Sequence, residues 1–340
     1  MNQRTGDLGR VFKRFVEPLR AHWRSVRRKR QRPHFARAFR AHMKRRCPEG
    51  HPMFAVWSDY AMTTVERGEE AVRIVEQRRS VRGLRSLDVG CAYGGFPIAF
   101  ARAGAVEAVG LELDTQLLAL GHELLRDMPC PANLLRGDAM DARFMASLGT
   151  FDVVTCNDVI EHVDDAWTLA RHLAAALRPS GLLCLWVPNS RAIEHVLSDP
   201  HYGLFGISLL PRPEAVEYYR NRFSEAYDVG EYYRLGAYVD GLSRHSVACE
   251  VIDEPDLSTP RVERLAEQVR DLDRTREDRI SECGGDAITR ERLRQAVCAY
   301  VTEFSGLYNV WRSSREAVEP ARRLVLEYGT GVWRLLGSKG

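Results

Sequence analysis

Two acids and a histidine lie close together in the segment Asp158-Val159-Ile160-Glu161-His162. The segment follows an apolar run that is typical of a buried strand, so its polar side chains lie where that strand ends. An imidazole beside a carboxylate can accept a proton from a hydroxyl group, which makes His162 a candidate general base and Glu161 its partner. Two carboxylates and an imidazole are also ligands that a divalent cation accepts.

A second imidazole follows the next predicted strand. His201 lies in the run D-P-H-Y-G-L-F-G at 199–206, whose turn-forming residues are not typical of a core. We expect this run to cover the pocket for the compound that carries the hydroxyl group, with His201 as the alternative base or a further metal ligand. Purely structural roles are the competing interpretation: Glu161 and His162 would brace the following helix, and His201 would be an exposed turn residue.

A turn of small residues is the second chemical signal. It comprises Gly90, Cys91, Ala92 and Gly94. Small side chains let the backbone turn tightly and approach a ligand. Glu112 ends another apolar run about twenty residues later, where a carboxylate can accept hydrogen bonds from ribose hydroxyls. Because Asp88 precedes the turn and would repel a pyrophosphate, the pattern favours a cationic nucleoside over NAD or FAD.

Strands that alternate with helices must position these groups. The apolar pattern predicts strands over 86–89, 106–111, 132–136, 151–157, 182–187 and 247–252, and helices over 96–103, 169–177, 191–197, 232–242, 262–280 and 288–311. Such an alternation is typical of an α/β fold with a parallel sheet, which binds its ligands at the carboxyl ends of the strands. The polar groups named above all follow predicted strands, so we expect them at one edge of the sheet.

The motifs D-x-G-x-A-x-G-G and V-G-L-E resemble the first two motifs of the class I S-adenosylmethionine-dependent methyltransferases. The resemblance continues through G-D-A-M at 137–140 and the strand at 151–157. It implies a Rossmann-like sheet of seven strands and S-adenosylmethionine (SAM) as the cofactor. Carried over by position, it implies that the cofactor is bound by Asp88, Gly90, Cys91, Ala92, Gly94, Glu112, Leu113, Asp138, Ala139, Asn157 and Asp158. Ala92 stands where the family more often has glycine.

Two further resemblances concern the acceptor. The segment D-x-x-E-H is similar to the E-x-x-E-H of small-RNA terminal-ribose methyltransferases and of ubiquinone-pathway O-methyltransferases, in which a divalent metal can bind substrate hydroxyls. Asp158 is one methylene shorter than that family's glutamate, and V-I-E-H also occurs in metal-free relatives, so we expect a reaction without metal. The run at 199–206 resembles a bacterial subgroup among glycan and natural-product enzymes.

These features predict O-methylation of a small-molecule or glycan hydroxyl, with Glu161, His162 and His201 as catalytic residues. The absence of N-P-P-Y or D-P-P-Y after the fourth strand argues against the family's usual modification of amino groups. An RNA terminal-ribose methyltransferase with a metal at D-x-x-E-H is one alternative. A non-catalytic scaffold is the other.

Positive charge is concentrated at the N-terminus. Residues 1–50 contain sixteen Lys and Arg and three acids, although the whole chain has a formal net charge of only +3. Apolar residues recur every three or four positions between 8 and 26, which predicts a basic amphipathic helix, and Phe35, Phe39 and Met43 begin a shorter one. The apolar face of residues 1–30 can pack on the core, on a second subunit or on an anionic membrane surface. Nucleic acid is disfavoured because the rest of the chain is acidic and shows no base-reading module.

The expected organisation has four segments. They are a basic amphipathic helical extension (1–50), a class I methyltransferase core (51–254), a helical insertion or cap (255–320) and the closing strand of the core (321–340). A helical appendage without a seventh strand is the alternative for the last two. The eight scattered cysteines contain no C-x-x-C, no apolar run could cross a membrane, and no secretory signal is present, so we expect a cytoplasmic protein. Peripheral contact with the inner membrane surface belongs to the membrane alternative for the arm.

Overall fold

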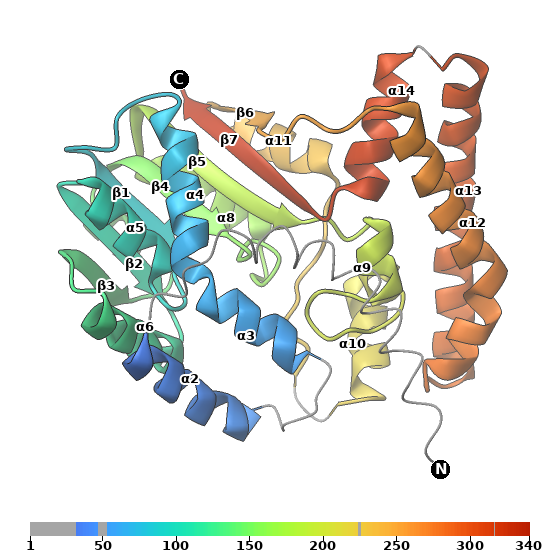
Figure 1. Cartoon of the computed structure of the whole chain (residues 1–340), viewed down its shortest axis with the longest axis horizontal. Helices are drawn as coiled ribbons and strands as arrows, with labels where there is room; N and C mark the ends of the chain where they lie inside the picture. The colour runs from blue at the N-terminus through green and yellow to red at the C-terminus, as the bar shows by residue number, and fades with distance from the viewer. Residues whose placement is uncertain (1–31, 47–52, 224–225, 316) are drawn as a thin grey trace.

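A seven-stranded sheet forms the centre of the molecule (Figure 1). The computed structural model describes residues 32–46, 53–223, 226–315 and 317–340. The strands are β1 (Arg85–Val89), β2 (Glu107–Glu112), β3 (Ala132–Arg136), β4 (Phe151–Asn157), β5 (Leu177–Pro188), β6 (Val247–Val251) and β7 (Val332–Lys339). Their order is β3-β2-β1-β4-β5-β7-β6, and only β7 runs antiparallel to its neighbours. The expected α/β class and seven-strand sheet are therefore confirmed.

Helices cover both faces of this sheet. The helices are α2 (Pro33–Arg46), α3 (Phe54–Met62), α4 (Thr64–Glu76), α5 (Gly95–Ala103), α6 (Thr115–Asp127), α7 (Ala142–Ser147), α8 (Ala166–Ala176), α9 (Ile193–Leu197), α10 (Arg212–Arg220), α11 (Leu235–Ser243), α12 (Thr259–Glu282), α13 (Ala287–Ser313) and α14 (Val318–Leu324), with single turns η1 (Ile207–Leu209) and η2 (Val325–Gly329). Helices α4 and α5 share one buried cluster with the sheet, and α8 and α11 share another. Two apolar layers thus fix the strand ends that carry the polar groups.

The closing strand is shorter than the sequence predicts. Residues 321–340 were expected to form it, but the strand begins only at Val332. Residues 318–329 form α14 and the π-helical turn η2 instead, in which Leu324, Val325 and Tyr328 face a buried cluster. An apolar run of this length does not distinguish a strand from a buried helical turn, which explains the error.

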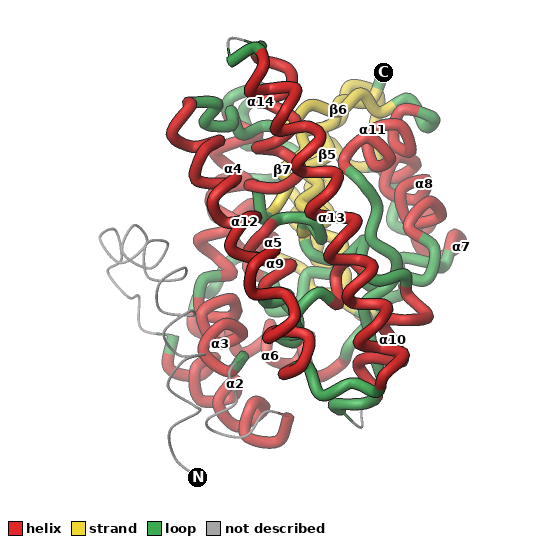
Figure 2. Tube along the Cα trace, turned by 90° about the vertical axis from the view of Figure 1, so that its right-hand side faces the viewer, coloured by secondary structure: helices red, strands yellow, loops and turns green. Residues whose placement is uncertain are grey.

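The two longest helices, α12 and α13, lie between β6 and β7 in the chain. They pack side by side along one flank of the molecule (Figure 2). Their apolar faces build a second core with α9, α10 and α14, in which Leu265, Leu293, Val297 and Trp311 are buried. This core lies next to the segment that follows β5, and so it supports the run at 199–206.

The N-terminal arm is described only from residue 32 onward. The predicted apolar stripe between residues 8 and 26 therefore lies outside the described residues. The predicted shorter helix is α2, and its Phe35 and Phe39 are buried against α6 and the ring of Tyr93. Asp127 accepts the backbone N–H of Phe35 at 2.9 Å and so satisfies a free donor at the start of α2. This half of the arm is part of the core.

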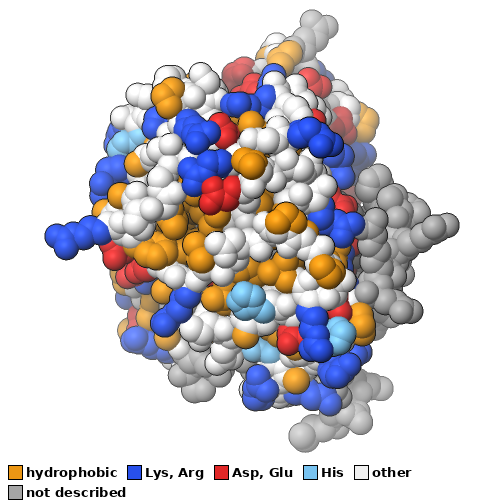
Figure 3. Space-filling model, turned by 90° about the vertical axis from the view of Figure 1, so that its left-hand side faces the viewer, with side chains coloured by type: hydrophobic (Ala, Val, Ile, Leu, Met, Phe, Trp, Pro, Cys, Tyr) orange, Lys and Arg blue, Asp and Glu red, His pale blue; other side chains and the backbone are white. Residues whose placement is uncertain are grey.

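The opposite side of the molecule, away from α12 and α13, ends in the edge strand β3. Figure 3 shows apolar side chains in a band on this face, between basic ones. Within β3 only Leu134 is buried, whereas Ala132 and Leu135 are partly exposed. Among the described residues no helix combines the length and the apolar character needed to span a bilayer.

Candidate active site

The turn after β1 has the backbone shape that its small residues predict. Gly90 and Gly94 have φ values of 71° and 73°, in the left-handed region that glycine adopts without strain. Ala92 is also left-handed, with φ 45°, which costs about 1–2 kcal/mol for a residue with a Cβ. A Cβ at Gly90 would lie 2.3 Å from Cγ2 of Val159, so only glycine lets the segment after β4 approach the turn.

Glu112 connects the end of β2 to this turn. Its buried carboxylate accepts the backbone N–H of Ala92 through Oε2 and that of Asp114 through Oε1, both at 2.8 Å. Asp88 lies on the neighbouring strand, is 4% exposed and accepts a hydrogen bond from the hydroxyl of Thr155 at 2.5 Å. Burial raises the pKa of Asp88 to about 7, against the opposing effects of the Thr155 hydrogen bond and the nearby Arg67.

The remaining residues that sequence reasoning assigned to the cofactor also follow strands. Cys91 is buried in the turn, and Leu113, after β2, is 59% exposed. Asp138 is exposed after β3, where its carboxylate accepts the N–H of Met140 at 2.8 Å. The carbonyl of Ala139 binds Nδ1 of His172 at 2.8 Å. These residues form a row along the edge of the sheet in the order β3, β2, β1.

The end of β4 continues this row. Asn157 is 6% exposed, and neither polar atom of its side chain has a partner among the described residues. Asp158 has a left-handed φ of 55°. Its Oδ2 accepts hydrogen bonds from the hydroxyl of Tyr60 at 2.8 Å and from Nη1 of Arg67 at 3.3 Å. The structure therefore holds Asp158 on the side of α3 and α4.

Glu161, His162 and His201 converge beside this point. Glu161 is fully buried, and its Oε1 lies 3.9 Å from Nε2 of His162 and 3.9 Å from Nε2 of His201. One ligand atom from each of the three lies within 4.8 Å of the other two. Neither oxygen of Glu161 has a hydrogen-bond partner among the described residues, and burial raises its pKa well above the usual range. Of the three groups in D-x-x-E-H, this cluster therefore contains Glu161 and His162 but not Asp158, and it includes His201, which the sequence suggested as a further ligand.

Two segments hold the imidazole rings in place. The buried carboxylate of Asp199 accepts the N–H groups of His201, Tyr202 and Leu204 at 2.6–3.0 Å, which fixes the turn at 199–206. Nδ1 of His201 also lies 3.1 Å from the hydroxyl of Tyr232. Burial, and then the charges of neighbouring histidines, lower the pKa of His201 well below its usual value.

Residues 226–234, which we call the strap, lie against the outer side of the site, where the His162 side chain remains 32% exposed. Nδ1 of His162 lies 3.0 Å from the carbonyl oxygen of Asp228, and the N–H of Gly230 donates to the carbonyl of Glu161 at 2.5 Å. A Cβ at Gly230 would lie 2.6 Å from the carbonyl oxygen of Val163, so the two backbones are in direct contact. Sequence reasoning missed the strap because nothing in its composition marks a contact with residues so distant in the chain.

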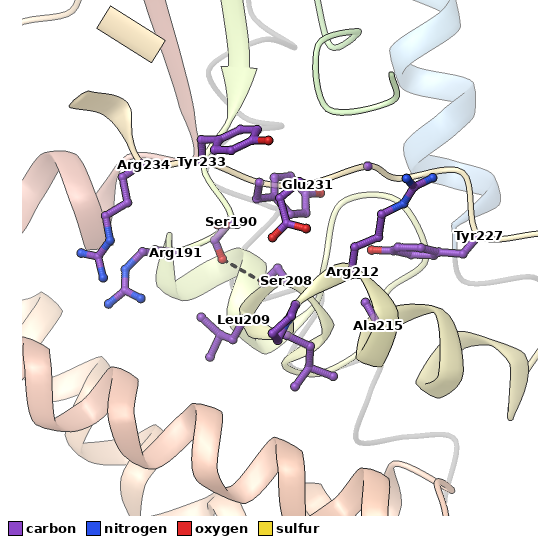
Figure 4. Close-up of a pocket in the computed structure, with 14 residues that line it drawn as sticks. Ser190, Arg191, Ser208, Leu209, Arg212, Ala215, Tyr227, Glu231, Tyr233 and Arg234 are labelled. Atoms are coloured by element: carbon purple, nitrogen blue, oxygen red, sulfur yellow. Dashed lines mark hydrogen bonds between the residues drawn. The ribbon is translucent and has the colours of Figure 1, made fainter. Parts of the chain in front are cut away.

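A polar pocket of about 210 Å³ lies along the strap (Figure 4). It is lined by residues from the end of β5, η1, α10 and the strap, among them Ser190, Arg191, Ser208, Arg212, Tyr227, Glu231, Tyr233 and Arg234. Arg191 and Arg234 both pair with Glu303 of α13, which neutralises part of their charge. Since Gly230 lies in contact with the backbone of residues 161–163, the strap separates this pocket from Glu161.

Comparison with known proteins agrees with this geometry. Residues 30–232 match a family described as a methyltransferase domain. A ubiquinone biosynthesis O-methyltransferase from Methylococcus capsulatus is 31% identical over 127 residues, which is 37% of this chain and 53% of that protein. The namesake from Vibrio campbellii is 32% identical over 108 residues, 32% of this chain and 45% of that protein. The chain thus spans about half the length of the curated relatives that it matches.

Among solved structures, the magnesium protoporphyrin IX methyltransferase from Synechocystis PCC 6803 with bound SAH is similar at a TM-score of 0.44 and 17% identity, over 64% of this chain and 89% of that chain. The family match covers more than half of the chain. The chain therefore belongs to the class I methyltransferases, which use S-adenosylmethionine as cofactor.

Proposed function

We propose that the protein transfers the methyl group of SAM to a hydroxyl group of a small-molecule acceptor. The convergence of Glu161, His162 and His201 beside the glycine turn carries this proposal, because an imidazole next to a carboxyl group can deprotonate a hydroxyl. The curated relatives, which are named as O-methyltransferases, also support it.

The cofactor would lie along the row of strand ends. Asp138 and Ala139 would bind the adenine, and Glu112 the ribose. Asp88, Asn157 and Asp158 would surround the methionine end. This order brings the sulfonium next to the histidine cluster, as a direct transfer requires.

In the reaction, His162 accepts the proton of the acceptor hydroxyl. The oxygen then forms a bond to the methyl carbon while the bond from sulfur to that carbon breaks, and S-adenosylhomocysteine (SAH), whose thioether sulfur carries no charge, leaves. Because Nδ1 of His162 faces the carbonyl of Asp228 and must donate there, Nε2 is the nitrogen that takes the proton. Glu161 releases its own proton to solvent before this step, and its carboxylate then stabilises the positive charge that forms on the ring. Orientation and exclusion of water supply the remaining rate enhancement.

The same donor set fits a divalent cation, because both oxygens of Glu161 lack partners among the described residues. Glu161, His162 and His201 would hold it, and a cation there would lower the pKa of the acceptor hydroxyl. Our proposal keeps His162 as the base, in accord with the expectation of a reaction without metal.

Transfer of labelled methyl groups from SAM to a panel of acceptors tests the proposed reaction. The panel contains phenols and catechols, sugars, and RNA with a free terminal ribose. We expect label in the small hydroxyl compounds. Label in RNA alone would contradict the proposal and favour the terminal-ribose alternative, and cofactor binding without transfer to any acceptor would favour a scaffold.

Removing the carboxylate of Glu112 tests the cofactor site. We expect Glu112→Ala to weaken SAM binding by about 1.5–3 kcal/mol, the range for hydrogen bonds to a charged group. Calorimetric titration measures this, with Glu282→Ala on the exposed end of α12 as the control. Equal affinity of Glu112→Ala and the parent would refute the assignment to the ribose.

The raised pKa of Asp88 predicts a pH-dependent affinity. Its pKa of about 7 in the cofactor-free protein means that a cationic ligand must favour ionisation, so SAM affinity is expected to rise by roughly tenfold from about pH 6 to pH 8. The free energy of unfolding is expected to depend on pH in the opposite direction. The folded state binds the proton of Asp88 more tightly than the unfolded chain does, so the stability that this proton contributes at low pH is lost as the pH rises to about 7. Asp88→Asn should abolish the dependence of affinity on pH, and an unchanged slope would exclude Asp88 as its source.

A further inference from the structure

Asp158 is held by two residues that lie far before it in the chain. Tyr60 on α3 donates its hydroxyl to Oδ2 of Asp158, and Arg67 on α4 donates Nη1 to the same oxygen. The guanidinium of Arg67 lies 3.4 Å from the centroid of the Tyr60 ring, so the two side chains also fix each other. Burial raises the pKa of Tyr60, which keeps its hydroxyl protonated and able to donate.

This arrangement leaves the other carboxylate oxygen free. Oδ1 of Asp158 accepts no hydrogen bond from any residue that the structure describes, whereas Oδ2 has two donors. The Asp158 side chain is 24% exposed, so a ligand can reach it. Arg67 is close enough to Asp88 for the two charges to interact, so one guanidinium serves two acids. When both acids are ionised, the three groups together carry one net negative charge.

The position of Asp158 in the fold determines which part of the cofactor would lie next to its carboxylate. The ribose acid Glu112 ends β2, and the histidine cluster follows β4, with β1 between these strands. A methyl group that passes from the sulfur of SAM to an acceptor at the histidine cluster must lie between Glu112 and that cluster. Asp158 directly follows β4 and adjoins the glycine turn through its neighbour Val159. The free oxygen of Asp158 therefore lies in the region that the sulfonium must occupy for the transfer.

We propose that Tyr60 and Arg67 position Asp158 to bind the sulfonium of SAM, and that this residue makes the protein prefer SAM over SAH. The two molecules share the adenosine and the amino acid and differ in the charged methylsulfonium. A carboxylate at that point attracts only the cationic form. Tyr60 is a positioning residue, since it acts through Asp158. The inference rests on the proposed transfer at the histidine cluster, and it holds whichever hydroxyl compound is the acceptor.

Calorimetric titration of the full chain with SAM and, separately, with SAH tests the proposal without turnover. We expect Asp158→Asn to weaken SAM binding about tenfold and to leave SAH binding within about twofold. Tyr60→Phe keeps the ring under Arg67 and loses only the hydroxyl, so it should weaken SAM selectively by about threefold. Asparagine is among the residues that tolerate a left-handed φ, so Asp158→Asn is expected to fold, and thermal unfolding verifies this.

The Glu112→Ala variant provides the comparison, because the ribose is common to both molecules and both affinities should fall together. Equal losses of SAM and SAH affinity in Asp158→Asn would overturn the proposal, as would no loss at all. Titration with Mn²⁺ provides a further test. If Asp158→Asn abolishes Mn²⁺ binding, Asp158 is a metal ligand and the assignment to the sulfonium is wrong.

Discussion

Replacing His162 by glutamine is expected to lower kcat by about a hundred- to ten-thousandfold, the range for loss of a general base. The side chain keeps its length and can still face the carbonyl of Asp228, but it cannot accept a proton. His201→Gln should cost less, because burial lowers the pKa of His201 well below its usual value and makes it a poor proton acceptor. Steady-state kinetics with the acceptor found in the labelling screen measures both.

The loss in His162→Gln should also shrink as the pH rises, because an acceptor that ionises unaided needs no base. His122→Gln provides a matched control, since His122 is exposed on α6 and contacts no part of the cluster. Full activity in the double variant of His162 and His201 would contradict general-base catalysis and leave orientation as the source of the rate.

The strands and the glycine turn could be predicted because their signals are local. An apolar run followed by small residues determines a strand and a turn within about ten positions, and five predicted strands lie within one or two residues of those observed. Alternation with helices predicts a parallel sheet and the family resemblance implies seven strands, but the order of the strands comes from the structure. Even the shared location of residues 88, 112 and 158 follows, since the carboxyl ends of parallel strands meet at one edge.

The parts of the site that depend on distant contacts could not be predicted. Tyr60 and Arg67 belong to no recognisable motif. Their contact with Asp158 depends on how α3 and α4 are placed relative to the end of β4. Asp158 lies outside the cluster of Glu161, His162 and His201, and it combines a left-handed φ with hydrogen bonds to Tyr60 and Arg67 that neither spacing nor residue type reveals. Likewise, Tyr232 was predicted to begin a helix, whereas it belongs to the extended strap and reaches His201.

Glu161→Gln is expected to lower kcat by about a hundredfold or more while leaving the protein at least as stable. Burial raises the pKa of Glu161, so the fold disfavours its ionised form, and a neutral side chain of the same size should not lower the free energy of unfolding. Catalysis differs, because the positive charge that forms on His162 is stabilised by a negative partner, and Oε1 of Glu161 lies 3.9 Å from Nε2 of that ring. Kinetics and thermal unfolding of the same variant separate the two effects.

This divergence between activity and stability would also follow if Glu161 held a cation, so the wild-type protein must be assayed after dialysis against EDTA. With His162 as the base, kcat should be unchanged, because no step requires a metal. Loss of activity that Mg²⁺ or Mn²⁺ restores would contradict the base mechanism and assign Glu161, His162 and His201 to a metal site. If Glu161→Gln lost stability together with activity, the carboxyl would be needed for folding, and its effect on kcat could not be assigned to catalysis.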